Sequence, residues 1–259
     1  MLYSRYREVE AVTFIRCVEI DWDAVAPDSY LRGIPALRFD GPLRLDSGVT
    51  FFVGENGTGK STLLEGIAVA WGFNPEGGGK NYRFSTYDSH SGLHKAVRLV
   101  RNPAKPRHSY FLRAESFYNV ASKAEEYRVS GLGESSEEDF YARYGGKALH
   151  HQSHGESFLH LAEGEFRPGG LYLLDEPEAA LSPQRQLSLL VLMHDLAAQG
   201  AQFIVASHSP ILLGMPDAAI LTFDDGEIHP CQWRDTESYR VTELFINQRD
   251  RLLRQLLED

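Results

Sequence analysis

The sequence predicts an α/β protein in which helices flank a mostly parallel central sheet, with a smaller antiparallel β part and a helical lobe. Three short apolar runs carry this prediction: Val49–Val53, Leu171–Leu174 and Gln202–Ala206. A nearly continuous apolar run of this length is typical of a strand buried on both faces, as in parallel sheets. Segments with helical apolar spacing follow the first two runs, and alternation of strand and helix is the pattern of an α/β fold.

The remaining elements are predicted from periodicity and from turn residues. In chain order they are a strand within Val12–Trp22, strands at Ala96–Arg101 and Ser109–Arg113, helices over 115–150, a helix from Pro183 to about Gln199, a hairpin at Ile220–Phe223 with its turn at Asp225–Gly226, and a last helix over 238–259. We expect one domain over 1–259, with an inserted antiparallel and helical lobe over about 75–160.

Composition excludes several classes of protein. Hydrophobic residues make up 42% of the 259, which is enough for a sizeable core, and the net charge of −10 argues against a protein that coats nucleic acid. No apolar run is long enough to span a membrane, so no direct membrane insertion is expected. The N-terminus shows no apolar signal region, and the two cysteines have no metal-ligand spacing, which together predict a cytoplasmic protein.

The first chemical motif is Gly54-Glu-Asn-Gly-Thr-Gly-Lys60-Ser61, between a predicted strand and a predicted helix. It fits the phosphate-binding P-loop, in which backbone N–H groups surround phosphates, the lysine reaches the β- and γ-phosphates and the hydroxyl ligates Mg²⁺. A glycine-rich turn that only happens to contain lysine is the competing interpretation, and the flanking strand and helix disfavour it. The expected nucleotide-binding residues are Gly54, Asn56, Gly57, Thr58, Gly59, Lys60, Ser61 and Thr62.

The second motif is Asp175-Glu176-Pro177, which follows the apolar run Leu171–Leu174. Ligand-binding groups of α/β sheets lie at the carboxyl ends of strands, so Asp175 is the expected partner of Mg²⁺ beside Ser61. Glu176 would act on the attacking water as general base.

With these motifs in place, the chain resembles the ABC-type ATPases. Asp175-Glu176-Pro177 followed by Ala179-Ala180-Leu181 is similar to their Walker B motif and D-loop, and Ser207-His208-Ser209-Pro210 is similar to their switch histidine. The resemblance implies ATP and Mg²⁺ as cofactors, and catalysis by Glu176, His208 and Lys60. A histidine at a strand end is otherwise a structural hydrogen-bonding group.

Ser153-His154-Gly155-Glu156 occupies the place of the signature loop of that family, with histidine where glycine is usual. The resemblance implies that Ser153 and Gly155 contact ATP held by a second protomer, so that the active unit is a head-to-tail homodimer formed on ATP binding. The alternative is an ordinary helix N-cap at Ser153.

The sequence departs from the family in two ways. The glutamine that usually follows the P-loop helix is missing, and the D-loop aspartate is replaced by Ser182. Three residues are open as substitutes for the glutamine: Asn81, Thr86 and Asp88. Three aromatic residues are open as the adenine-stacking ring: Tyr30, Trp22 and Phe39.

The cellular role has three competing predictions. The resemblance is strongest to stand-alone bacterial ATPases of the recombination-repair and SMC-like group, which predicts a switch acting with DNA or with a repair or defence protein. Its direct support is the basic stretch Lys95–Arg113 with Tyr110 and Phe111 interleaved, since cations hold phosphates and rings stack on bases. A solvated antiparallel hairpin explains that stretch equally well. The alternatives are the energising subunit of a membrane transporter and an ATP-gated regulatory module.

Overall fold

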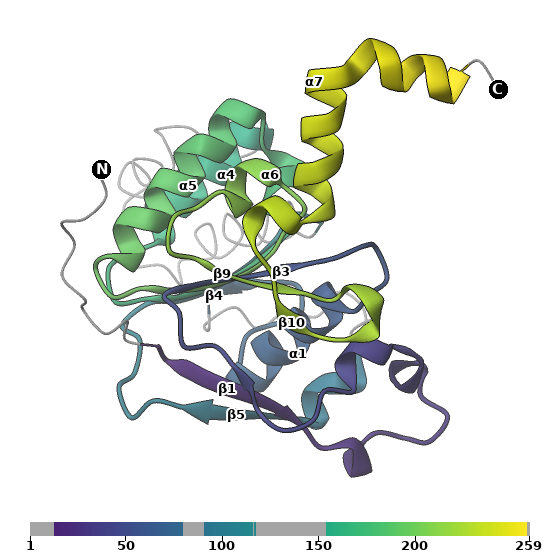
Figure 1. The fold of residues 1–259 in the computed structure, drawn as a ribbon. Coiled ribbons are helices and arrows are strands. Elements are labelled where there is room, and N and C mark those ends of the chain that lie inside the picture. The colour runs from purple at the N-terminus through teal and green to yellow at the C-terminus, as the bar shows by residue number, and fades with distance from the viewer. Residues whose placement is uncertain (1–12, 80–90, 116, 118–153, 258–259) are drawn as a thin grey trace.

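The computed structural model describes residues 13–79, 91–115, 117 and 154–257. Within them the chain forms a large, mostly parallel sheet and a small antiparallel sheet (Figure 1). The large sheet contains, in spatial order, β10 (His229–Pro230), β9 (Ala219–Thr222), β3 (Val49–Val53), β8 (Gln202–Ala206), β7 (Leu171–Asp175), β6 (Ser109–Arg113) and β4 (Gly78–Gly79). The small sheet contains β2 (Leu43–Arg44), β1 (Ile15–Ile20) and β5 (Val97–Arg101).

The predicted fold class is confirmed. Strands β9, β3, β8, β7 and β6 run parallel to their neighbours, and only the edge strands β10 and β4 are antiparallel. The three apolar runs that predicted the fold are β3, β7 and β8, and all their residues are buried. The α-helices are α1 (Lys60–Trp71), α4 (His154–Glu165), α5 (Pro183–Ala197), α6 (Pro210–Leu213) and α7 (Glu237–Leu257). Short 3₁₀ helices are η1 (Trp22–Ala24), η2 (Tyr30–Gly33), η3 (Pro35–Leu37), η4 (Gly92–Lys95), η6 (Pro177–Ala180), η7 (Asp224–Gly226) and η8 (Trp233–Asp235).

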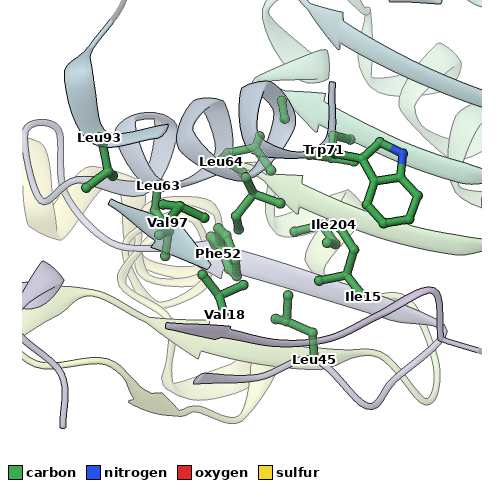
Figure 2. Packing of buried hydrophobic residues seen from close by; sticks show 14 of the residues in the cluster. Ile15, Val18, Leu45, Phe52, Leu63, Leu64, Trp71, Leu93, Val97 and Ile204 are labelled. Atoms are coloured by element: carbon green, nitrogen blue, oxygen red, sulfur yellow. The ribbon is translucent and has the colours of Figure 1, made fainter. Parts of the chain in front are cut away.

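Helix α1 is enclosed between the two sheets. Its residues Leu63 and Leu64 pack with Val18 of the small sheet and with Phe52 and Ile204 of the large one (Figure 2). A helix that is apolar around most of its circumference needs such an enclosed position. The opposite face of the large sheet is covered by α4, α5 and α6, whose buried residues form a second apolar cluster. The P-loop helix is therefore packed between the small sheet and one face of the large sheet, while the second cluster covers the other face.

The antiparallel hairpin proposed for Lys95–Arg113 is wrong. Strand β5 pairs with β1 in the small sheet, whereas β6 pairs in parallel with β7 in the large one. Tyr110 and Phe111 are buried at 3% and 0% exposure, so neither ring is available to stack on a base. The signal for this burial is the consecutive apolar run Tyr110–Leu112, which marks a strand covered on both faces. The described part of the proposed 75–160 lobe thus contributes β4 and β6 to the large sheet and β5 to the small one, and most of the rest lies outside the described residues.

The C-terminal part agrees with the predicted order of elements. Ser182 accepts a hydrogen bond from the Arg185 N–H and caps α5, with Pro183 in the first turn. Strands β9 and β10 form the predicted hairpin. Helix α7 projects from the body, has no buried residue and is interrupted at Gln248 by a non-helical backbone (Figure 1). None of the described helices is long and apolar enough to cross a membrane.

Candidate functional site

The P-loop connects the carboxyl end of β3 to the first turn of α1. Gly54 and Gly59 have positive φ angles of 136° and 103°, a conformation that glycine adopts without strain. A Cβ on Gly54 would lie 2.9 Å from a carboxylate oxygen of Asp224, and one on Gly59 would lie 2.8 Å from Ile34. Asn56 and Gly57 are exposed at the tip, while Thr58, Ser61 and Thr62 are partly buried. The loop therefore presents backbone N–H groups at a helix N-terminus, the usual arrangement for binding phosphate.

Lys60 is 4% exposed, and its Nζ donates hydrogen bonds of 2.7 Å to the carbonyl oxygens of Gly54 and Glu55. Burial lowers the pKa of Lys60, and the nearby carboxylates of Glu176, Asp224 and Asp175 oppose that shift. The ammonium group thus lies across the P-loop, where phosphate oxygens can replace the two carbonyl acceptors.

Asp175 ends β7 and is 6% exposed. Burial raises its pKa, while the Arg113 cation and the Ser61 hydroxyl lower it. Its Oδ1 is buried and accepts no hydrogen bond from the residues that the structure describes. A buried carboxylate oxygen without a donor, beside a serine hydroxyl, fits a Mg²⁺ ion, because Mg²⁺ takes oxygen ligands and keeps several waters.

Glu176 and His208 face each other across the ends of β7 and β8. The side-chain Oε1 of Glu176 lies 3.9 Å from Nε2 of His208, and both side chains are partly exposed. Glu176 has a left-handed backbone, with φ 49° and ψ 51°, and its N–H donates to the Ala206 carbonyl. Such a conformation is uncommon in a residue other than glycine and is concentrated at functional sites. A partly exposed carboxylate beside a histidine can orient a water molecule and accept its proton.

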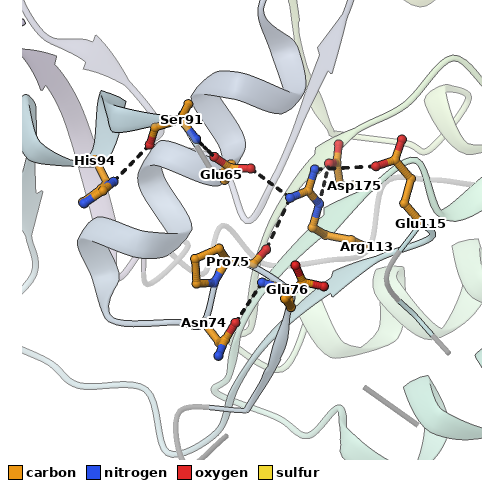
Figure 3. Close-up of polar contacts among 9 residues, drawn as sticks. All are labelled: Glu65, Asn74, Pro75, Glu76, Ser91, His94, Arg113, Glu115 and Asp175. Carbon is orange, nitrogen blue, oxygen red and sulfur yellow. Dashed lines mark hydrogen bonds and ion pairs between the residues drawn. The ribbon is translucent and has the colours of Figure 1, made fainter. Parts of the chain in front are cut away.

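Three groups at this edge were missed by the sequence analysis: Glu178, Asp224 and Arg113. Glu178 is largely buried, which raises its pKa, and it accepts a hydrogen bond from the His208 N–H, which lowers it. Asp224 accepts from the N–H of Glu55 and from Thr222. Arg113 forms ion pairs with Asp175 and Glu65 (Figure 3). Position at the carboxyl end of a strand was the available signal for Arg113, which ends β6, and for Asp224, which lies two residues beyond β9; no such signal marks Glu178.

The structure describes only some of the other predicted site residues. Gly155 is buried in the first turn of α4, against the Ala180 carbonyl and the Arg185 side chain of the same chain. Ser153 and the three candidate substitutes for the glutamine, Asn81, Thr86 and Asp88, lie outside the described residues.

A cleft of about 820 Å³ opens beside the P-loop between Pro35 and Asp224. Among the described residues that line it there is none of the three aromatic candidates for adenine stacking. Tyr30 is 64% exposed, Trp22 has the Arg32 guanidinium over its ring, and Phe39 packs against the core. The stacking partner of adenine stays a prediction.

Two protein-family models match parts of the chain. Residues 31–140 match a family described as an AAA domain. Residues 159–214 match one described as an AAA domain, putative AbiEii toxin, Type IV TA system. The first range includes the whole P-loop, and the second includes Asp175, Glu176 and His208.

Two curated relatives are similar over most of the chain. The hemin import ATP-binding protein HmuV of Pseudomonas aeruginosa is 29% identical over 189 residues, which cover 68% of this chain and 72% of the relative. The thiamine import ATP-binding protein ThiQ of Cereibacter sphaeroides is 28% identical over 176 residues, covering 61% and 69%.

Two solved structures have a similar backbone. A putative metal-chelate type ABC transporter in an inward-facing conformation has a TM-score of 0.46 and 18% identity, covering 80% of this chain and 81% of that one. The SMC head domain of Thermotoga maritima has a TM-score of 0.45 and 16% identity, covering 85% and 100%.

Proposed function

Because the chain is an ABC-type P-loop ATPase, we propose that it binds ATP with Mg²⁺ and that water cleaves the bond between the β- and γ-phosphates, giving ADP and phosphate. The observation that carries the proposal is the convergence of Lys60, Asp175, Glu176 and His208 at one edge of the large sheet. Asp175 ends β7, Glu176 follows it, and His208 lies just beyond β8, while Lys60 begins α1 after the loop that follows β3; β3, β8 and β7 are neighbours in the sheet. Ligands of α/β sheets bind at that edge.

Each residue has a separate task in the proposed reaction. The P-loop N–H groups and Lys60 bind the phosphates, and Lys60 holds the γ-phosphate as charge develops on it. Glu176 accepts a proton from the attacking water, and His208 contacts the γ-phosphate from the next strand. Ser61 and Asp175 would hold Mg²⁺, which supplies charge neutralisation of the phosphates when bound.

Replacing Glu176 by Gln tests the hydrolytic part of the proposal. The amide keeps the size of the side chain but cannot take a proton, so we expect ATP turnover to fall by about 10² to 10⁴. ATP affinity should change little, because Glu176 does not bind the phosphates. Glu163→Gln, an exposed position on α4, is the matched control and should hydrolyse ATP as the wild type does. Unchanged turnover in Glu176→Gln would remove Glu176 as the base.

A head-to-tail homodimer follows from the same family template. By their position in the sequence, Ser153 and Gly155 correspond to the signature loop of that family, and Gly155 lies in the first turn of α4, where the helix dipole favours an anion. The partner's ATP would be bound there, so the loop would complete a site that one chain leaves open on one side.

The role in DNA repair, chromosome maintenance or defence rests on motif resemblance and on the basic stretch Lys95–Arg113. The aromatic part of that support is lost, because Tyr110 and Phe111 are both buried. The AAA domain match that names a toxin system keeps a defence partner among the options. ATPase assays with and without duplex DNA test the DNA option, since a DNA-driven switch should change its turnover on binding.

An import system is the second candidate. It is favoured by the two curated relatives, both named as ATP-binding proteins of import systems. It predicts recruitment to membranes only when a membrane partner is co-expressed, which fractionation of cell extracts would show. A chain that stays out of the membrane fraction with every co-expressed membrane partner would contradict it.

A further inference from the structure

One cation contacts the metal-binding carboxylate within the described part of the chain, and it is not the P-loop lysine. Arg113 Nε lies 3.3 Å from Oδ2 of Asp175 (Figure 3). Lys60 is directed instead to the carbonyl oxygens of Gly54 and Glu55. Because β6 and β7 pair with Arg113 opposite Asp175, the sheet itself fixes this contact.

The same guanidinium is drawn more strongly to a second carboxylate. Nη1 of Arg113 donates a 2.8 Å hydrogen bond to Oε2 of Glu65, while its Nε makes no hydrogen bond of good geometry to Asp175. Glu65 is 8% exposed on α1, and its Oε1 accepts from the Ser91 N–H at 2.8 Å. Glu65 is thus fixed in place and holds Arg113 (Figure 3).

A further carboxylate and a carbonyl complete the surroundings of Arg113. Glu115, two residues beyond, has its Oε2 at 3.9 Å from Nη2 and an 86% exposed side chain. The Pro75 carbonyl accepts from Nη1 at 3.3 Å. Arg113 therefore has other acceptors when its contact with Asp175 is lost.

We propose that Arg113 is an internal counter-cation of Asp175. The way in which Arg113 shares its charge between Asp175 and Glu65 would then set the affinity of the site for Mg²⁺. The inference rests on the proposed function, because it takes Asp175 as the metal ligand. Arg113 is a positioning residue in this account: it contacts the carboxylate and not the substrate.

The physical reason is competition between two cations for one buried carboxylate. A positive charge within a few ångströms of a metal ion opposes its binding, and burial limits screening by salt. Removing the charge of Arg113 therefore favours the metal. Removing the charge of Glu65 has the opposite effect, because Arg113 is then released toward Asp175 and one nearby negative charge is lost. A role in folding alone would make both substitutions weaken the site.

The test measures Mn²⁺ binding, in place of Mg²⁺, by the electron paramagnetic resonance signal of free Mn²⁺ in the presence of saturating ADP, so that no hydrolysis is involved. We expect Arg113→Gln to lower the Mn²⁺ dissociation constant and Glu65→Gln to raise it, each by about tenfold, the usual lower bound for groups that contact a metal's ligands. The double variant, which removes both charges, should lie close to the wild type. Arg98→Gln, an exposed arginine on β5, is the control and should change nothing.

Thermal unfolding of each variant shows whether it is folded, and the double variant keeps the test valid if one buried charge alone destabilises the chain. Weaker binding in both single variants, or no change in either, overturns the inference. Failure of the wild type to bind Mn²⁺ with ADP would instead overturn the proposed metal site, so the two failures are distinguishable.

Discussion

The protonation of His208 depends on burial, on one cationic neighbour and on two anionic ones. Burial lowers the pKa of His208 and the Lys60 ammonium lowers it further, while Glu176 and Asp224 raise it. The net shift is downward from the ordinary value of about 6.5. The lowered pKa favours the neutral imidazole, in which one ring nitrogen is a donor and the other an acceptor.

A pH titration checks this at the residue scale. We expect the His208 imidazole signal, followed by NMR, to titrate below pH 6.5 in the wild type, and Lys60→Met to raise its pKa because the neighbouring cation is gone. The stability linked to neutral His208 is then complete above pH 6.5 and decreases as the pH falls, since only the unfolded chain protonates readily there. Comparison with His208→Gln assigns the signal. A pKa that does not move in Lys60→Met would show that the two side chains do not interact.

The residues of the site could be predicted where a local pattern carries them. Asp175 follows an apolar run directly, and Lys60 and His208 belong to short motifs just beyond such runs, so all three were predicted. Arg113, Glu178 and Asp224 contact partners 30 to 169 positions away, and such pairings depend on how the strands are ordered in the sheet.

Among the elements, β8 has a structural task that its apolar pattern does not reveal. Gln202 is fully buried at its first position. Its Oε1 accepts from the N–H groups of Phe14 and Ile15, and its Nε2 donates to the carbonyls of Ile15 and Leu45. One side chain thereby connects the large sheet to the small one.

Replacing Gln202 by Leu should lower the free energy of unfolding by about 3 kcal/mol or more, because several buried backbone groups lose their partners. Urea denaturation measures it. Gln184→Leu, on the exposed face of α5, is the control and should stay within about 0.5 kcal/mol of wild type. A loss no larger than the control would show that the two sheets are held by apolar contacts alone.

The start of α4 requires glycine for close packing. A Cβ on Gly155 would lie 2.9 Å from the Ala180 carbonyl oxygen, which belongs to backbone and cannot easily move. Gly155→Ala should therefore destabilise the fold by about 1 to 3 kcal/mol. Gly33→Ala has open space around it and is the control. Equal melting temperatures for the two variants would contradict the packing, and would leave the partner's ATP as the remaining reason for glycine at 155.

Strand existence was predictable from sequence, and strand pairing was not. The runs at β3, β7 and β8 are apolar because they lie inside a parallel sheet, and the pattern is local. Strands β5 and β6 are near neighbours in sequence with a short connection, which favours a hairpin. Their separation into different sheets follows from contacts with β1 and β7, far away along the chain.

At the scale of the whole molecule, the groups that we propose as catalytic lie at the carboxyl ends of the central strands of the large sheet, while α1 is held between two sheets and α7 projects from the body. We expect a second copy of the chain to bind at the carboxyl ends of these strands, where the proposed reacting groups lie. In the proposed dimer each ATP is bound between the P-loop of one chain and the signature-like loop of the other, so association depends on nucleotide.

The most direct test of this account is the molar mass of the Glu176→Gln protein in solution, measured by light scattering with and without Mg²⁺ and ATP. We predict a monomer without nucleotide and a dimer with it, because this variant retains ATP at the interface. Lys60→Met, which cannot hold the phosphates, should stay monomeric under both conditions. A Glu176→Gln protein that binds ATP and remains a monomer would contradict the account.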